Sequence, residues 1–253
     1  MTTTYNQLEK EVTALINRLR QNPQSIVADL DKMRKFYDGK YFINQDLKAK
    51  MATHEGVSAV NEALDFVYKQ QPIGAVKRNR ALDLAARQMQ NYLEKTGKVS
   101  AEQENMKMGQ RVKMFVKEGG LYAENISFGV VNPVNVINQF MVSDGITHRI
   151  HRTNLLNPRF THVGVAMGPH KDYGFVCVLQ FYGPKTGEKS TLIDLYDEAY
   201  DPNIIPKVEG SKSVNIQVQT QIVGNVRHKK FIYKFALING GEVIEEYQSQ
   251  GPV

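Results

Sequence analysis

Apolar residues at helical spacing predict a helix over residues 5–20, whose apolar face another surface must cover. The stripe consists of Leu8, Val12, Leu15, Ile16 and Leu19. Asn22-Pro23 places a capping residue before a proline at the first helical position, so a second helix is predicted up to residue 33. After Asp38-Gly39, residues 40–55 show no period, which predicts an irregular segment.

Three more helices follow along the chain. Apolar residues recur every three or four positions over residues 57–67, and again over residues 79–95, with Gly97 just past the end. Pro133 to Val142 predicts another helix with its apolar side chains facing inward. The stretch from Gly97 to Gly120 is polar and has few motif residues that would fix its alignment to another sequence.

Strands are predicted in the second half of the chain. Residues 160–167 and 173–182 alternate between apolar and other side chains, and the turn residues between them favour an antiparallel hairpin. A polar linker with two prolines follows. Three further strands are predicted at the C-terminal end, with Asn239-Gly240-Gly241 as a hairpin turn. Their ranges are 214–219, 230–238 and 243–247.

Composition and charge narrow the function classes. The 253 residues carry a net charge of +6, which favours an acidic partner, while short basic runs such as Lys77-Arg78-Asn79-Arg80 are typical of solvated surface. With Cys177 alone, no disulfide can form within the chain, and no secretory signal or membrane-spanning stretch is visible. The sequence therefore predicts a soluble intracellular protein. No nucleotide or nucleic-acid motif is present.

Two blocks of residues carry a resemblance to a known family. The stronger contains Ala123-Glu124-Asn125-Ile126 and His151-Arg152-Thr153-Asn154-Leu155 and ends at Phe181; the weaker covers residues 60–93. They resemble the CAP superfamily of cysteine-rich secretory, antigen 5 and pathogenesis-related proteins. Gly168-Pro169-His170-Lys171-Asp172-Tyr173-Gly174 is similar to its intracellular eukaryotic members.

The resemblance implies an α+β fold, an α-β-α sandwich around a small antiparallel sheet. It implies a CAP domain over residues 56–184, with an N-terminal helical extension at 1–55. A linker and a C-terminal antiparallel β region would fill residues 185–253. The extension and the C-terminal region are similar to additions in the intracellular members.

The resemblance also implies a cavity that two histidines and two acidic residues form in the family. Glu124 and His151 match two of these positions, while Lys98 and Ser143 stand at the other two, with Asp144 directly after Ser143. Since a divalent ion needs three or four convergent donors, we expect no metal and no cofactor. A Lys98 side chain in the cavity would pair with Glu124 instead. Histidine at Lys98 and an acid at Ser143 would then create metal affinity.

Other readings of these residues stay open. Glu124 and His151 would serve the fold alone if one capped backbone amides and the other were a satisfied half-buried histidine. His148, His151, His162 and His170 cluster in the sequence, but nothing forces them to converge. Ser127 lacks the motif of a catalytic nucleophile, and Cys177 is predicted to be an inert core thiol. A Ser143–His151–Glu124 triad requires a geometry that spacing does not supply. No catalytic residue is predicted.

Three functions follow from this reading. The first is a non-enzymatic interaction scaffold, a structural component of a larger assembly whose protein partner is an acidic cytoskeletal polymer, with a cytoskeletal or ciliary location. The second is binding of a lipid or sterol, as in several CAP proteins, which needs an apolar groove. The third is a cation-dependent hydrolase, which the incomplete donor set argues against.

Overall fold

A computed structural model defines the fold of most of the chain. It describes residues 5–44, 48–103, 106–116, 118–188, 190, 192, 211–223, 226–237 and 242–252. The chain divides into two compact units, Met1–Asp194 and Leu195–Val253, and each is described by itself. Within the described residues, no helix combines the length and the apolar character that crossing a membrane requires.

A four-stranded sheet forms the centre of the first unit. Its order is β4 (Lys77–Arg78), β6 (His162–His170), β7 (Gly174–Pro184) and β5 (Gly120–Phe128). β6 and β7 form the predicted antiparallel hairpin, and β5 pairs antiparallel with β7. The sheet is not wholly antiparallel as predicted, because the connection before α4 runs beside β6 and adds β4 by a short parallel pairing.

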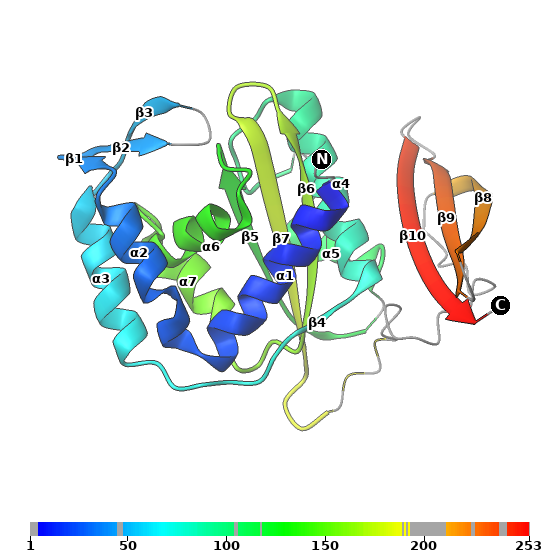
Figure 1. Ribbon diagram of the computed structural model, residues 1–253, viewed down its shortest axis with the longest axis horizontal. Coiled ribbons are helices and arrows are strands. Elements are labelled where there is room, and N and C mark those ends of the chain that lie inside the picture. Colours follow the sequence, from blue (N-terminus) through cyan, green and yellow to red (C-terminus); the bar gives the residue numbers. More distant parts are fainter. Residues whose placement is uncertain are drawn as a thin grey trace. The chain divides into compact units, whose positions relative to one another are not determined.

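Helices cover both faces of this sheet, which makes the first unit an α-β-α sandwich (Figure 1). One face carries α4 (Arg80–Thr96) and α5 (Met108–Lys113). The core on the other face joins five helices, α1 (Tyr5–Gln21), α2 (Val27–Arg34), α3 (Val57–Tyr68), α6 (Pro133–Val142) and α7 (Ile150–Leu155). Along β7, Cys177, Leu179 and Phe181 face this second group, and Val176, Val178 and Tyr182 face α4 and α5. The strand alternation predicted from the sequence therefore fills two separate cores.

The segment predicted as an N-terminal extension is part of this sandwich. α1 is followed by a 3-10 turn, Pro23–Ile26, and by α2 (Val27–Arg34). Val12, Ile16 and Leu19 of α1 are buried in the same core as the strands β6 and β7. The Glu9 carboxylate accepts a hydrogen bond from the backbone N–H of Met167, 2.9 Å away. Residues on both sides of the predicted boundary at residue 55 thus pack into one continuous core.

Residues 40–55 are not irregular as predicted. A three-stranded sheet of β1 (Tyr37–Asp38), β2 (Tyr41–Asn44) and β3 (Ala49–Ala52) stands above α2 and α3 (Figure 1). Successive residues of β2 are apolar on both of its faces, so hydrophobicity does not alternate there although the strand does. The β2–β3 hairpin is therefore an element that the pattern of hydrophobic residues did not predict.

The second unit is a three-stranded antiparallel sheet. Its order is β10 (Glu242–Pro252), β9 (Val226–Leu237) and β8 (Ser211–Val223), and each pair is antiparallel. The three strands predicted from the sequence are confirmed and are longer than predicted. The predicted turn at Asn239-Gly240-Gly241 and most of the predicted linker lie outside the described residues.

Candidate functional site

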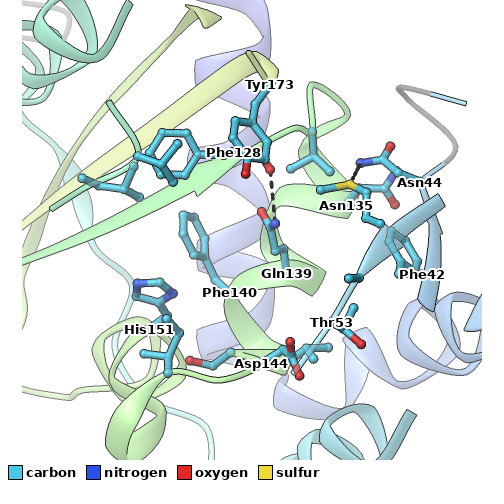
Figure 2. A pocket seen from close by; sticks show the side chains of 18 of the residues that line it. Phe42, Asn44, Thr53, Phe128, Asn135, Gln139, Phe140, Asp144, His151 and Tyr173 are labelled. Carbon is cyan, nitrogen blue, oxygen red and sulfur yellow. Dashed lines mark hydrogen bonds between the residues drawn. The ribbon is translucent and has the colours of Figure 1, made fainter. Parts of the chain in front are cut away.

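A cavity of about 410 Å³ lies beside β5, the strand at one end of the central sheet. The β2–β3 hairpin supplies one wall, α6 and the segment that leads to α7 supply another, and the loop after α4 supplies a third. Figure 2 shows Phe42, Asn44 and Thr53 of the hairpin region across the cavity from His151. Residues from three separate parts of the chain therefore enclose one space.

Most of the lining is apolar. Three different elements and a turn give it aromatic and aliphatic surface, from Phe42, Ile126, Phe128, Phe140, Val142 and Tyr173. Gln139 is tied down within this surface, because its side-chain amide donates to the Phe128 carbonyl, 3.2 Å away, and its oxygen accepts from the Ser127 hydroxyl. These contacts fix α6 against β5 and hold the cavity open between them.

Glu124 lines the cavity from β5, as the resemblance implied, but its partner differs from the predicted one. Its carboxylate accepts from the guanidinium of Arg111 on α5, and the two side chains are 6% and 0% exposed respectively. Burial raises the pKa of Glu124, and the Arg111 charge opposes that shift. The predicted pairing of Lys98 with Glu124 is wrong, because Arg111 holds the carboxylate.

Lys98 is not part of the lining. It follows Gly97, whose left-handed backbone (φ +70°) ends α4, and its side chain is exposed. Its amine lies 5.9 Å from the centre of the Tyr92 ring, and its carbonyl oxygen lies 3.1 Å from Nε2 of His170. The next residues, Val99 and Ser100, line the cavity instead. A histidine at Lys98 would therefore not complete a metal site with Glu124.

Ser143 and Asp144 reach the cavity at the C-terminal end of α6. Ser143 ends the helix in a left-handed conformation (φ 52°), and its buried hydroxyl has no hydrogen-bond partner within the described residues. The Asp144 carboxylate accepts from the backbone N–H groups of His54 and Glu55, at 2.7 and 2.9 Å. The Ser143 hydroxyl is thus able to hydrogen-bond a ligand, while the Asp144 carboxylate holds the end of the hairpin in place.

His151 lines the cavity from α7. Its ring meets Phe140 edge to face, with 5.4 Å between ring centres. Burial lowers its pKa from 6.5 to about 4, so the imidazole is neutral at physiological pH. Phe140 and His151 stand side by side at the cavity wall in Figure 2.

The residues next to Glu124 and His151 in the two motifs have structural roles. The Asn125 side chain donates to the His151 carbonyl at 2.9 Å and accepts from Asn154 at 2.8 Å. Arg152 donates to the carbonyls of Met141 and Val142 at the end of α6. These bonds lock α6, α7 and β5 together. The Asn and Arg of the motifs therefore build the wall, while Glu124, Ile126 and His151 line the space.

The other predicted histidines do not join this site. His148 is exposed, with a left-handed backbone (φ 54°), and His162 lies on β6 near Tyr182. His170 accepts from the backbone N–H groups of Asp172 and Tyr173 at the β6–β7 turn. In the described part of the chain, no three His, Cys, Asp or Glu side chains come together in a way that suits a metal ion.

The donor chemistry does not fit a divalent ion. Glu124 is neutralised by Arg111, and Asp144 is bound by two backbone N–H groups, so among the described lining residues His151 is the one His, Asp or Glu side chain without such a partner. A catalytic triad fails for a similar reason, because the Glu124 carboxylate orients Arg111 and not His151. Cys177 is fully buried, and burial raises the pKa of its thiol, as expected of a core cysteine.

Sequence reasoning overlooked two parts of this site. Arg111 lies in the polar stretch between Gly97 and Gly120, on a helix of six residues that is too short for a clear period. The hairpin residues Phe42 and Asn44 lie in the segment taken as irregular. The run Tyr41-Phe42-Ile43 in an otherwise polar region was the available signal, since such a run needs cover on one side.

The fold and this cavity define a CAP-type sandwich with an altered set of cavity residues. A model of the CAP family, described as the cysteine-rich secretory protein family, matches residues 13–181. The chain belongs to this family, and the match includes most of α1, within the segment predicted as an extension. No curated protein sequence matches the chain.

Two solved structures are similar to the chain. An extracellular protein of Bacillus anthracis that contains an SCP domain has 19% identity and a TM-score of 0.37 over 60% of this chain. The match covers 43% of that protein, so this chain corresponds to less than half of it. An outer surface protein of Borrelia burgdorferi has 15% identity and a TM-score of 0.40, over 58% of this chain and all of that one.

Proposed function

We propose that this protein is a non-enzymatic binding protein whose cavity takes a small, mostly apolar molecule with an uncharged hydrogen-bonding group. The observation that carries this function is the cavity itself, about 410 Å³ with a mainly aromatic and aliphatic lining. That size lies within the range of small-molecule sites, which are apolar with a few well-placed polar groups. Of the functions predicted from the sequence, lipid binding is the one this geometry supports best.

The polar groups of the lining select the head group. The Ser143 hydroxyl is buried without a partner among the described residues, and His151 is neutral. A buried polar atom without a hydrogen bond costs free energy, which a ligand hydroxyl or carbonyl would recover. Glu124 and Asp144 are acidic, and no lysine or arginine lies among the described lining residues. Because Arg111 neutralises Glu124, an anionic head group would meet the charge of Asp144 and find no lysine or arginine in the described lining to pair with.

The test is to purify the protein from native cells, extract it with organic solvent and identify the released molecules by mass spectrometry. Ala101→Trp should empty the cavity, since Ala101 is an exposed lining residue that can carry a large ring without disturbing the core. Glu102→Trp is the matched control, because Glu102 is exposed and outside the lining. Wild type and the control should yield the same apolar compound, and Ala101→Trp should not. Equal yields from all three would contradict the proposal.

The scaffold role in a cytoskeletal or ciliary assembly stays a prediction. It rests on the net charge of +6 and on the β-sheet unit that follows residue 194. Co-purification from native cells tests it, because a structural component would sediment with a large assembly. A monomer that sediments with no cytoskeletal fraction would contradict it.

A further inference from the structure

The β2–β3 hairpin carries apolar side chains on both faces. Its inner face places Phe42 and Met51, directly paired across the strands, against the cavity. Its outer face carries Tyr41 and Ile43, which are 48% and 42% exposed. A hairpin that only covered a ligand would need a polar outer face. The exposed tyrosine and isoleucine therefore indicate a surface that meets something apolar.

The mouth of the cavity continues this apolar surface. Val99, on the loop after α4, is 53% exposed and also lines the cavity. The loop and the hairpin are separate walls of the same opening. Val99 on the loop and Tyr41 and Ile43 on the hairpin thus add exposed apolar side chains to these two walls.

The same segment concentrates the positive charge of the chain. Residues 31–52 contain six basic residues, Lys32, Arg34, Lys35, Lys40, Lys48 and Lys50, and three acidic ones, Asp31, Asp38 and Asp46. The excess of three stands against a net charge of +6 for all 253 residues. Arg34 pairs with Asp31, while Lys35, Lys40 and Lys48 are exposed. About a twelfth of the chain thus holds half of its net charge, next to the exposed Tyr41 and Ile43.

Lys50 links the charged and the apolar parts of this face. Its amine lies 2.7 Å from the Asp38 carboxylate and 4.7 Å from the centre of the Tyr41 ring. The contact holds the ring at the surface between lysines. Aromatic rings flanked by lysines suit the boundary between lipid head groups and acyl chains, where the ring sits in the interface and the ammonium groups meet phosphates.

We propose that the outer face of the β2–β3 hairpin docks on an anionic membrane and sets the mouth of the cavity at the lipid surface. This inference rests on the proposed function, because a membrane is the source of an apolar ligand with a neutral head group. An acidic protein would satisfy the lysines alone. The exposed Tyr41, Ile43 and Val99 around the opening favour the lipid surface.

The experiment is co-sedimentation of the full chain with vesicles of phosphatidylcholine alone, or of equal parts phosphatidylcholine and phosphatidylserine. Wild type should sediment with the anionic vesicles only, and added salt should weaken the binding. Lys40→Gln with Lys48→Gln should weaken it roughly thirtyfold, since each lysine near an anionic surface contributes about a factor of five. Tyr41→Ser with Ile43→Ser should weaken it as well.

Lys10→Gln with Lys69→Gln is the matched charge control. Both lysines are exposed and lie outside the hairpin, Lys10 on α1 and Lys69 at the far end of α3. This variant should sediment like wild type. Equal losses in the control and in the hairpin variants would mean that overall charge explains the binding and would overturn the proposal. Binding to polyglutamate without binding to vesicles would overturn it in favour of an acidic protein partner.

Binding of 1-decanol, measured in parallel, separates this inference from the proposed function. The variants of Tyr41 and Ile43 should keep decanol affinity, because neither residue lines the cavity. A wild type that binds decanol but not anionic vesicles would overturn the membrane inference alone. A wild type that binds the vesicles but not decanol would overturn the proposed function and leave the docking surface standing.

Discussion

Arg111 is the residue that changes the chemistry of this cavity. A buried carboxylate needs a cation, and in this chain the cation is a guanidinium from α5. Two of its nitrogens, Nε and Nη1, are buried and have no hydrogen-bond partner in the described part of the chain. The pair therefore serves to neutralise Glu124 more than to maximise stability. Its position leaves the Glu124 carboxylate paired within a lining that is mainly apolar.

Removal of Glu124 alone should destabilise the protein strongly. Glu124→Ala leaves the Arg111 charge buried and unpaired, and such a change costs about 3–5 kcal/mol. The matched control, Arg111→Met with Glu124→Leu, removes both charges at similar volume and should cost far less. Urea unfolding measures both. A double variant as unstable as the single one would show that the pair matters for packing and not for charge.

His151 should make stability depend on pH. The folded pKa of about 4 lies below the usual 6.5, so the unfolded chain takes up a proton that the folded chain refuses. Stability should fall as pH drops from 6.5 towards 4, by on the order of 2 kcal/mol. His151→Gln should lack this component. Unfolding curves for the two proteins that stay parallel across this pH range would contradict the neutral, buried imidazole.

Ser143 should affect binding more than folding. Ser143→Ala removes a hydroxyl that has no partner among the described residues, so stability should change by less than about 1 kcal/mol. Affinity for 1-decanol should fall by about fivefold, the worth of one hydrogen bond. Calorimetry and thermal unfolding measure the two effects. A variant with unchanged affinity would remove Ser143 from the head-group site.

At the scale of elements, sequence periodicity predicted the long helices well. α1, α3, α4 and α6 begin and end within two residues of their predicted limits, because one face of each is buried and the caps are clear. The motif residues Glu124 and His151 lie in the lining of the cavity. The β2–β3 hairpin was not predicted, since Tyr41 and Ile43 are apolar although they are exposed, and Phe42 between them faces the cavity, so hydrophobicity does not alternate. Short elements such as α5 span too few residues to show a helical period, and for that reason the role of Arg111 was not predicted.

The hairpin is fastened to the rest of the molecule by the segment between α6 and α7. Asp144 accepts from two N–H groups at the end of the hairpin, and Glu55 pairs with Arg149 and accepts from the Gly145 N–H at 2.8 Å. Arg149 itself adopts a left-handed backbone (φ 51°), a conformation that its bonds to Glu55 and Glu62 help to hold. The carboxylates of Asp144 and Glu55 thus help to hold the hairpin over the cavity.

Asp144→Ala should loosen this cover. Loss of two charge-assisted hydrogen bonds should speed amide exchange at His54 and Glu55 and lower stability by about 2 kcal/mol. Asp31→Ala is the control, because its pair with Arg34 is exposed and contributes little. Hydrogen exchange followed by mass spectrometry measures the exchange rates in both variants. Unchanged exchange at residues 54 and 55 would show that the hairpin holds without Asp144.

At the scale of the whole molecule, the chain combines a sandwich with a separate β-sheet unit. The cores of the sandwich are built from residues of the first unit, and its cavity lies entirely within that unit. Spacing in the sequence predicted the β6–β7 hairpin and the three strands of the second unit, while the cavity depends on side chains from Met33 to Tyr173 that meet only in the folded chain. No local pattern carries that information.

Truncation after residue 194 should leave the sandwich intact. The shortened chain should keep its melting temperature within about 4 °C, the shift that roughly 1 kcal/mol produces in a domain of this size. It should also bind 1-decanol as the full chain does. A truncated protein that unfolds or loses the ligand would show that the second unit completes the first.

The most direct test of the account compares two ligands that differ only in their head group. Calorimetric titration of the full chain at neutral pH with 1-decanol and with decanoate sets an alcohol against a carboxylate on the same apolar tail. The account predicts that decanol binds, that decanoate binds roughly tenfold more weakly or worse, and that Ala101→Trp abolishes decanol binding while Glu102→Trp does not. Tighter binding of decanoate, or decanol binding that survives in Ala101→Trp, would contradict it.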